Sequence, residues 1–227
     1  MVNVKVISQH FEDIIKNHPK MKLKGIHRRV QSELHVNVNM SRCRRAKNMV
    51  SSRLAGNCRE EFAKLWDYAD ELRTQNPGST IRMAVNRVSD TSPPHFKRFY
   101  VCFDTVKRGW KEGCRPIIGL DGCFLKGPFK GVMLLAIGRD GNDQMYPIVW
   151  AVVENESTHS WSWFLSLVTV DLELEDGFEY NIISDQHIGL EIAINDILPR
   201  VEHRNCARHV YANWSGRKRS KEYEFGF

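Results

Sequence analysis

The first part of the chain carries apolar residues at the spacing of amphipathic helices. In Phe11–Ile15 and Ile26–Leu34 they stand three and four positions apart, which predicts two short helices. The run 35–39 breaks that period, and a third helix is predicted from Arg42 to Leu54. Two helices joined by a short turn are typical of a helix-turn-helix unit, although the same spacing occurs in many helical bundles.

Cap and turn residues set the expected ends of the next elements. Ser41 is expected to cap the third helix and Gly56 to end it. A fourth helix is predicted over Arg59–Thr74, with an apolar stripe suited to core packing. A strand is predicted over Thr80–Val88, followed by a linker over residues 90–95 that contains two prolines.

The rest of the chain alternates strands and helices. Strands are expected at 117–121, 132–137, 146–153 and 180–184, and helices at 158–174 and 189–198. Short turns make the first three strands an antiparallel meander. This order of elements is that of the ribonuclease H fold. The predicted fold class is therefore α/β, with a ribonuclease H-like domain at 93–227 after a basic all-α segment at 1–92.

Charge is unevenly distributed along the chain, whose net charge is +6. Residues 1–59 hold 13 Lys and Arg against 3 Asp and Glu, whereas residues 101–227 hold 14 against 18. A basic head on an acidic body favours a polyanion-binding module, and the alternative is a solvated basic surface. The sequence has no apolar run long enough for a membrane span and no signal-peptide core, so its six scattered cysteines are expected to be reduced thiols inside the cell.

Basic side chains of the third predicted helix are candidate DNA contacts. A helix of this kind can lie in the major groove, with its cations near phosphates or base edges. The candidates are Arg42, Arg44, Arg45, Lys47 and Arg53. A solvated helix face would carry the same residues, so the pattern alone leaves both interpretations open.

Two aspartates follow apolar strands in the second part of the chain. Asp121 ends the strand at 117–121 and Asp185 follows the strand at 180–184. If these strands are parallel neighbours, both carboxylates project from the same edge of the sheet. A divalent cation such as Mg²⁺ would remove their mutual repulsion and could support phosphoryl displacement. The alternative is that each aspartate caps the segment after it.

A Cys-x-x-His pair is the last group of candidate site residues. Cys206 and His209 have the spacing of zinc ligands, but no second pair lies nearby to complete four ligands. A packed or hydrogen-bonded cluster near the active site is favoured over zinc. Arg204 and Arg208 within the same block could meet phosphate or be surface charge.

Four sequence blocks, in one order, resemble the Mutator-like element (MULE) transposase domain of plants. The blocks are Gly113–Gly127, Ala136–Ile148, Ile182–Gln186 and His203–Asn213. The upstream stretches Leu65–Thr80 and Phe96–Phe103 resemble the region that precedes this domain.

The resemblance implies a ribonuclease H-like DDE transposase core. Asp121 and Asp185 match the family's first two catalytic, metal-binding aspartates, and Cys206 and His209 match its Cys-x-x-His motif. The implied reaction is metal-dependent hydrolysis of a DNA strand at the element's end, then transfer of the freed 3′-hydroxyl to target DNA. It implies Mg²⁺ or Mn²⁺ as cofactor without zinc, double-stranded DNA as partner, no membrane and the nucleus as location. It also allows a homo-oligomer.

The sequence departs from the family pattern at the third carboxylate. The family places a Glu well downstream of the Cys-x-x-His block, and Glu222 and Glu224 lie too close to His209 to take that role. The family's terminal zinc-binding modules have no counterpart either. The expectation is a central fragment of a transposase, incomplete at its C-terminus and catalytically inactive alone. The alternatives are a domesticated, transposase-derived DNA-binding regulator of transcription and a nuclease that acts on RNA–DNA hybrids.

Overall fold

The computed structural model describes residues 2–87, 94–126 and 130–220, without the side chains at 55–61, 63 and 216–220. These residues form two compact units that divide the chain after Asp67. The predicted boundary between residues 92 and 93 and most of the predicted linker lie outside the described residues. The units divide earlier because strand β1 (Thr80–Asn86) pairs with β2 (His95–Cys102) and so belongs to the sheet of the second unit.

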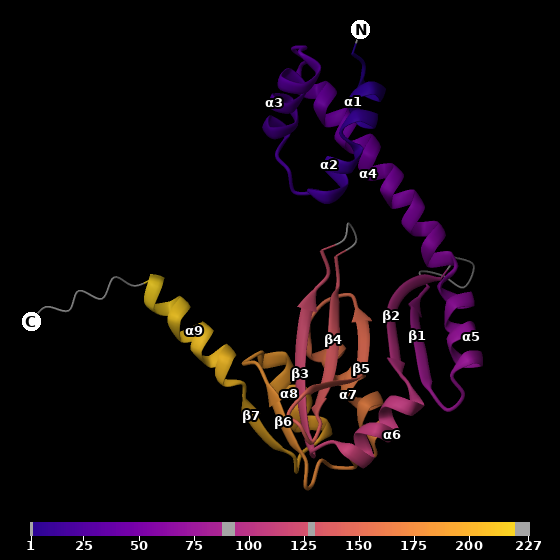
Figure 1. The fold of residues 1–227 in the computed structure, drawn as a ribbon, viewed down its shortest axis with the longest axis vertical. Coiled ribbons are helices and arrows are strands. Elements are labelled where there is room, and N and C mark those ends of the chain that lie inside the picture. Colours follow the sequence, from indigo (N-terminus) through magenta and orange to yellow (C-terminus); the bar gives the residue numbers. More distant parts are fainter. Residues whose placement is uncertain (1, 88–93, 127–129, 221–227) are drawn as a thin grey trace, which may run out of the picture. The chain divides into compact units, whose positions relative to one another are not determined.

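Unit 1 is helical, as its apolar periodicity predicts. Its described helices are α1 (Val4–His10), α2 (Glu12–Asn17), α3 (Leu23–Leu34) and α4 (Met40–Ala63), shown in Figure 1. The side chains that form its core are Ile7, Phe11, Ile15, Ile26, Val30, Val38, Cys43, Ala46 and Val50. The positions that predicted the first two helices therefore lie in one apolar core.

The third predicted helix is longer than its end signals indicate. Gly56 does not end α4, which continues to Ala63. Glycine in a helix interior costs only about 1 kcal/mol relative to alanine, which a continuing helix can tolerate. Ser41 lies inside the first turn, and Asn39 Oδ1 accepts hydrogen bonds from the backbone N–H groups of Ser41 and Arg42 at 2.7 and 3.2 Å. Asn39 therefore takes the capping role predicted for Ser41.

The fourth predicted helix is shorter than expected and less buried. Helix α5 covers Leu65–Gln75. Ala69 is fully buried, whereas Phe62 and Trp66 of the predicted core stripe are exposed. The prediction that the whole stripe packs into a core is wrong, because only part of it faces other elements.

Unit 2 is a mixed α/β arrangement around a seven-stranded sheet, with the described strands in the order β1-β2-β5-β4-β3-β6-β7. Strand β6 is parallel to β3 and β7, and the other neighbours are antiparallel. The remaining elements are α6 (Asp104–Gly113), β3 (Ile117–Phe124), β4 (Val132–Arg139), β5 (Met145–Val153), α7 (Thr158–Leu172), β6 (Asn181–Ser184), α8 (Ile188–Ile197), β7 (Glu202–Asn205) and α9 (Ala207–Ser220).

The elements predicted for this unit are present with the predicted order. Strands β3, β4 and β5 form the expected antiparallel meander, followed by α7, β6 and α8. The sequence did not predict β2, α6, β7 or α9. Both missed strands contain charged residues, and β7 is a four-residue strand of polar side chains, so neither shows apolar alternation.

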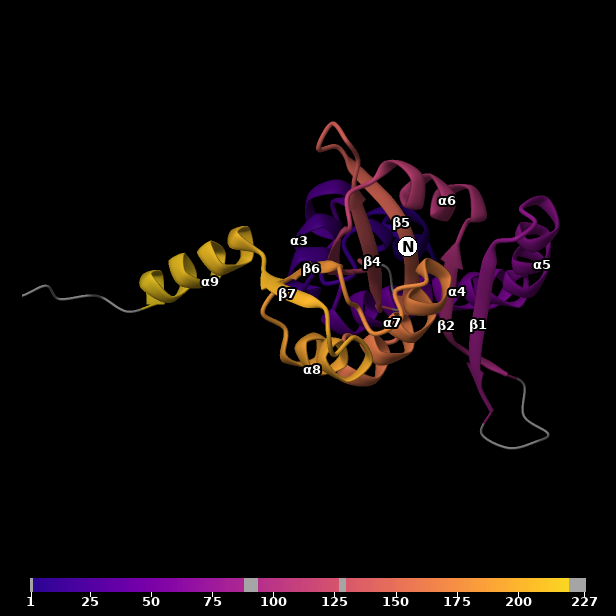
Figure 2. The ribbon, with the colours of Figure 1, turned by 90° about the horizontal axis from the view of Figure 1, so that it is seen from below.

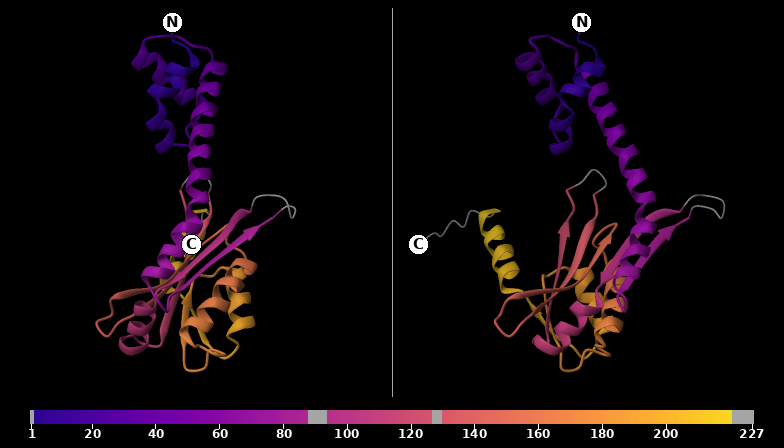
Figure 3. Two further views of the ribbon diagram at one scale, coloured as in Figure 1. Left: turned by 90° about the vertical axis from the view of Figure 1, so that its right-hand side faces the viewer. Right: turned by 45° about the vertical axis from the view of Figure 1, so that its right-hand side comes forward.

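Helices α7 and α8 cover one face of the sheet, as Figures 2 and 3 show. Trp161 and Phe164 of α7 and Leu190 of α8 pack there against strand residues such as Leu120 and Leu134. This buried layer packs against β3, which lies between β4 and β6 in the sheet. Across the described residues, no helix combines the length and the apolarity needed to cross a membrane.

A buried carboxylate joins four elements of unit 2. Asp171 of α7 accepts hydrogen bonds from Tyr100 Oη on β2 at 2.7 Å and from Thr80 Oγ1 on β1 at 2.5 Å. Lys107 Nζ of α6 lies 3.6 Å from Asp171 Oδ1. Burial raises the pKa of Tyr100 and raises the pKa of the neighbouring Cys102 thiol to about 12. Both groups are therefore neutral at physiological pH, and the Asp171 charge is balanced by donors.

Replacing Tyr100 by phenylalanine should lower the free energy of unfolding by about 1.5–3 kcal/mol, because a buried carboxylate loses one of its donors. The measurement is urea denaturation of the full chain. Tyr180→Phe is the matched control, since Tyr180 is half-buried and stacks on Trp110 with its ring. Equal losses in the two variants would contradict the role given to the hydrogen bond with Asp171.

Candidate functional site

The parallel pairing of β3 with β6 relates the segments that carry Asp121 and Asp185. Asp121 does not end its strand as predicted, because β3 continues to Phe124 in its pairing with β4, whereas Asp185 directly follows β6. In this parallel pair Ile117 lies opposite Asn181 and Gly119 opposite Ile183, an offset of 64 positions. Asp121 and Asp185 are also 64 positions apart, each two residues beyond the last pair of this ladder, Gly119 and Ile183. The condition on which the predicted site depends, that the two strands are parallel neighbours, is met.

Each aspartate has one oxygen engaged by a nearby backbone donor. Gly122 N–H donates to Asp121 Oδ1 at 2.9 Å, and His187 N–H donates to Asp185 Oδ1 at 3.1 Å. Asp121 Oδ2 lies 3.5 Å from Arg208 Nη2, with the two side chains 41% and 74% exposed. The contact to His187 is the capping role that the sequence left open, and it occupies only one oxygen of Asp185.

The donor chemistry at this edge suits a hard divalent cation. Mg²⁺ takes oxygen ligands and usually binds through one or two carboxylates, with water and phosphate oxygens completing its shell. Within the described residues, no group of three or more His, Cys, Asp and Glu side chains is arranged to hold a metal ion. Two aspartates fit a cation shared with a phosphate ligand, and their metal-binding role stays a prediction.

The Cys-x-x-His pair lies beside the end of β6. Cys206 N–H donates to the carbonyl of Ser184 at 2.7 Å, and the Cys206 carbonyl accepts from Val210 N–H at 3.0 Å as α9 begins. His209 Nε2 lies 3.2 Å from Arg208 Nη2. Its Nδ1 is buried without a hydrogen-bond partner among the described residues. The block therefore fixes the start of α9 next to Asp185.

His203 supports the same strand end from β7. Its Nε2 lies 2.8 Å from Ser184 Oγ, and Ser184 Oγ donates to the carbonyl of Asp185 at 2.9 Å. Burial lowers the pKa of His203, and the charge of Glu191 partly opposes that change. A neutral His203 is therefore favoured beside the carboxylate edge.

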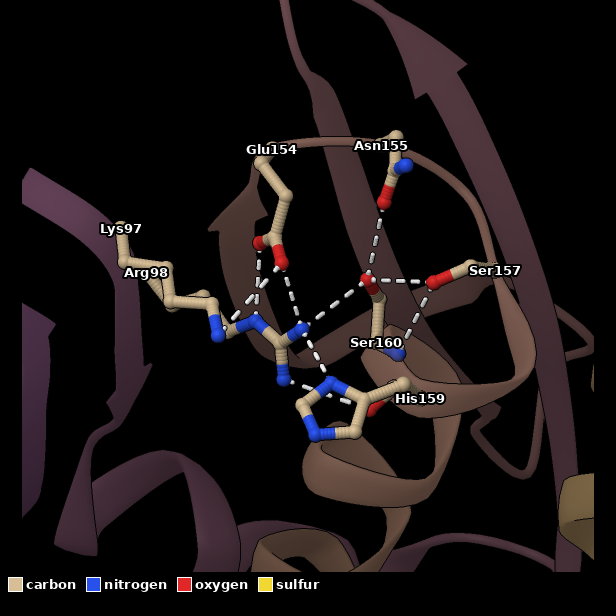
Figure 4. A network of polar contacts seen from close by, with 7 residues as sticks. All are labelled: Lys97, Arg98, Glu154, Asn155, Ser157, His159 and Ser160. Carbon is tan, nitrogen blue, oxygen red and sulfur yellow. Dashed lines mark hydrogen bonds and ion pairs between the residues drawn. The ribbon is translucent and has the colours of Figure 1, made fainter. Parts of the chain in front are cut away.

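A network centred on Arg98 orders the loop between β5 and α7, and no sequence pattern predicts it. Arg98 is 2% exposed and binds both carboxylate oxygens of Glu154, at 2.7 and 2.8 Å (Figure 4). Its Nη2 also lies 2.7 Å from His159 Nδ1 and donates to Ser160 Oγ at 3.3 Å. This guanidinium thus holds both ends of the loop that starts α7. Only its partners, 56 and more positions away, explain a buried arginine in a strand.

The ordered loop carries a third carboxylate close to the aspartate edge. Glu156 Oε1 accepts from Trp161 Nε1 at 3.3 Å. It also lies only 2.9 Å from where a Cβ at Gly122 would be, directly after Asp121 in the chain. Glu156 therefore approaches the backbone of β3, and Gly122 leaves the space for it. This carboxylate was not predicted because the loop shows no periodic pattern.

The predicted DNA-binding residues of unit 1 differ in their availability. Arg42, Arg44 and Arg45 are exposed on α4. Lys47 Nζ donates to the carbonyl of Met21 at 2.7 Å, and Arg53 binds Glu12 Oε2 at 2.9 Å, so both have partners inside the unit. In unit 2, Arg204 pairs with Glu202 on β7, while Arg208 contacts Asp121.

One part of the second unit is similar to a known protein family. Residues 117–213 match the family model of the MULE transposase domain, over strands β3 to β7 and the first half of α9. This part of the chain, 97 of its 227 residues, is therefore similar to a transposase domain. A search of the curated proteins found no match.

Replacing Glu154 by glutamine should lower the free energy of unfolding by about 1–2 kcal/mol near neutral pH, because the Arg98 guanidinium loses its charged partner. The value is modest because Glu154 is 37% exposed and partly screened by water. The hydrogen bonds from Arg98 lower the pKa of Glu154. Its stabilisation should therefore be complete above the ordinary pKa of a glutamate and be lost as the pH falls through that lowered pKa.

Urea denaturation at about pH 7 and about pH 3 tests this pH dependence, with Glu112→Gln as the control for an exposed glutamate of the same unit. Wild type and Glu154→Gln should differ at the higher pH and converge at the lower one. A difference that persists when Glu154 is protonated would show that the ion pair is not its cause.

Proposed function

We propose that the chain is a MULE-type transposase protein whose second unit is a ribonuclease H-like DDE core acting on double-stranded DNA in the nucleus. The family-model match over residues 117–213 supports the transposase assignment. The strand order β5-β4-β3-β6-β7, with three antiparallel strands followed by two parallel ones, supports the ribonuclease H-like core. The observation that carries the proposal is the parallel β3–β6 pairing, whose offset of 64 positions equals the separation of Asp121 and Asp185 along the chain.

In this proposal Asp121 and Asp185 hold Mg²⁺ or Mn²⁺ through the oxygens that their backbone donors leave available. The bound cation would supply charge neutralisation and activation of water or a 3′-hydroxyl for an in-line phosphoryl displacement. The chain's own residues position the DNA strand. Gly122 N–H and His187 N–H fix the two carboxylates, and the exposed Arg208 beside Asp121 is placed to bind a phosphate.

We assign only two of the three carboxylates that a DDE active site uses. Two of the three family carboxylates correspond to Asp121 and Asp185, and we assign no third one within residues 1–227. We therefore propose that these residues bind DNA and a divalent cation but do not cleave DNA alone. The alternative function is a transposase-derived regulator, in which DNA binding by unit 1 is retained and the carboxylates are not used.

Removing either carboxylate should weaken cation binding. Asp121→Asn and Asp185→Asn should each weaken Mn²⁺ binding by tenfold or more, because a cation shared by two carboxylates loses half of its protein charge, about 1.4 kcal/mol or more. Calorimetric titration of the full chain with Mn²⁺ is the measurement. Asp196→Asn, on the exposed side of α8, is the matched control and should bind as wild type does.

A cleavage assay tests the proposal that the chain alone does not cleave DNA. The same proteins are incubated with end-labelled duplex DNA and Mg²⁺. Strand cleavage by the wild-type chain that is lost in Asp121→Asn would contradict that proposal. Mn²⁺ affinity that is equal in all four proteins would contradict the assignment of the metal ligands. A parallel incubation uses an end-labelled RNA–DNA hybrid, and cleavage confined to that hybrid would favour a ribonuclease instead.

The three exposed arginines of α4 should carry part of the DNA affinity. Replacing Arg42, Arg44 and Arg45 together by glutamine should lower the dependence of log affinity on log salt by about one for each phosphate that these arginines neutralise. Fluorescence anisotropy with duplex DNA over a salt series measures this slope. The control replaces Lys5, Lys16 and Lys20, which are exposed elsewhere in unit 1, and removes the same charge. Equal effects of the two triple variants would instead favour a solvated basic surface without a defined DNA-contact helix.

A further inference from the structure

Helix α9 exposes a pair of aromatic side chains. Tyr211 is 67% exposed and Trp214 is 52% exposed, and their ring centroids lie 6.0 Å apart with an angle of 38° between the ring planes. Large aromatic rings gathered on one exposed face are typical of binding surfaces, since they offer much contact area at a low cost in conformational entropy. The face follows β7 at the edge of the sheet (Figure 1).

This aromatic pair begins next to the carboxylate edge. Tyr211 follows Arg208 by three positions, so the two side chains lie on neighbouring parts of one helix face. Arg208 Nη2 is 3.5 Å from Asp121 Oδ2. Trp214 follows Arg208 by six positions, which is about 9 Å along a helix axis and about three nucleotides of a stacked strand.

Two contacts fix α9 to the body of unit 2. Cys206 N–H donates to the Ser184 carbonyl at 2.7 Å at the start of the helix, and Asn213 Nδ2 donates to Gln186 Oε1 at 3.1 Å between the two aromatic positions. Both acceptors flank Asp185 in the chain. The aromatic pair is therefore held at a defined place relative to Asp185.

The charges beside the aromatic pair indicate what it binds. Arg204 and Arg208 are both exposed near the start of α9, and the sequence continues after Trp214 with Arg217-Lys218-Arg219. Cations that precede and follow exposed aromatic rings along the chain suit a nucleic-acid strand, whose phosphates meet the cations while its bases stack on the rings.

We propose that Tyr211 and Trp214 form a stacking platform for an unpaired nucleotide of the DNA strand that is bound at Asp121 and Asp185. The proposal rests on the proposed function, because it takes the carboxylate edge as the place where the strand is processed. Bases inside a duplex do not offer their faces, so the platform selects a frayed, overhanging or flipped nucleotide.

The test compares two DNA probes with the full chain in the absence of divalent cations. One probe is a blunt duplex. The other is the same duplex with an overhang of about three nucleotides that contains 2-aminopurine, whose fluorescence falls when it stacks. Wild type should bind the overhang probe more tightly than the blunt one and quench its fluorescence. Tyr211→Ala/Trp214→Ala should weaken overhang binding about five- to hundredfold and leave blunt-duplex binding within about twofold.

Two further variants separate stacking from damage to the fold. Trp214→Phe keeps a ring and should retain most of the preference for the overhang. Phe178→Ala removes an aromatic side chain that is 55% exposed outside α9 and should change neither affinity. Wild-type quenching is measured without any substitution, so it tests the platform even if the double variant does not fold.

The outcomes distinguish a failure of the stacking platform from a failure of the proposed function. Equal affinity of wild type for both probes without quenching, or equal losses on both probes in the double variant, would overturn the stacking platform alone. A wild-type chain that binds neither probe would overturn the proposed DNA-processing function together with the platform.

Discussion

The parallel pairing of β3 with β6 is the constraint on which the candidate site depends. It sets an offset of 64 positions, and Asp121 and Asp185 are separated by that same number. Each aspartate accepts one backbone N–H, and Arg208 lies beside Asp121. A shift of β6 by one residue would turn Asp185 to the other face, so the register specifies the site.

Most of unit 2 serves to keep that register. Helices α7 and α8 bury one face of the sheet, and Arg98 ties β2 to both ends of the loop that begins α7. Asp171 joins α7 to β1, β2 and α6 through buried hydrogen bonds and an ion pair. These polar contacts specify which elements meet, because a buried charge in any other arrangement would lack its partners.

The apolar pattern of the sequence predicted the strands and helices that bury regular apolar stripes. It did not predict the features that depend on polar contacts between residues far apart in the chain. Strands β3, β4 and β5 and helices α7 and α8 bury regular apolar stripes, so the sequence alone placed them within a few residues. Strand β2 was missed because buried Arg98 interrupts its apolar pattern. Gly56 predicted a helix end, but α4 continues through it to Ala63 at the small cost of a glycine in a helix interior. In the site, the two aspartates were predicted from their position after strands, whereas Glu156 and the Arg98 network come from a loop without any repeating pattern.

Within the proposed function, Arg208 links the carboxylate edge to the DNA strand. Its pairing with Asp121 is exposed, and exposed ion pairs contribute only about 0–1 kcal/mol, so the guanidinium can exchange Asp121 for a phosphate at little cost. A cation at Asp121 and Asp185 would compete with Arg208 for the same oxygen and favour that exchange. Metal binding and strand binding would then support each other, because each removes the reason for Arg208 to remain on Asp121. The aromatic pair on α9 would gain its nucleotide in the same step, since Tyr211 stands one helical turn from Arg208.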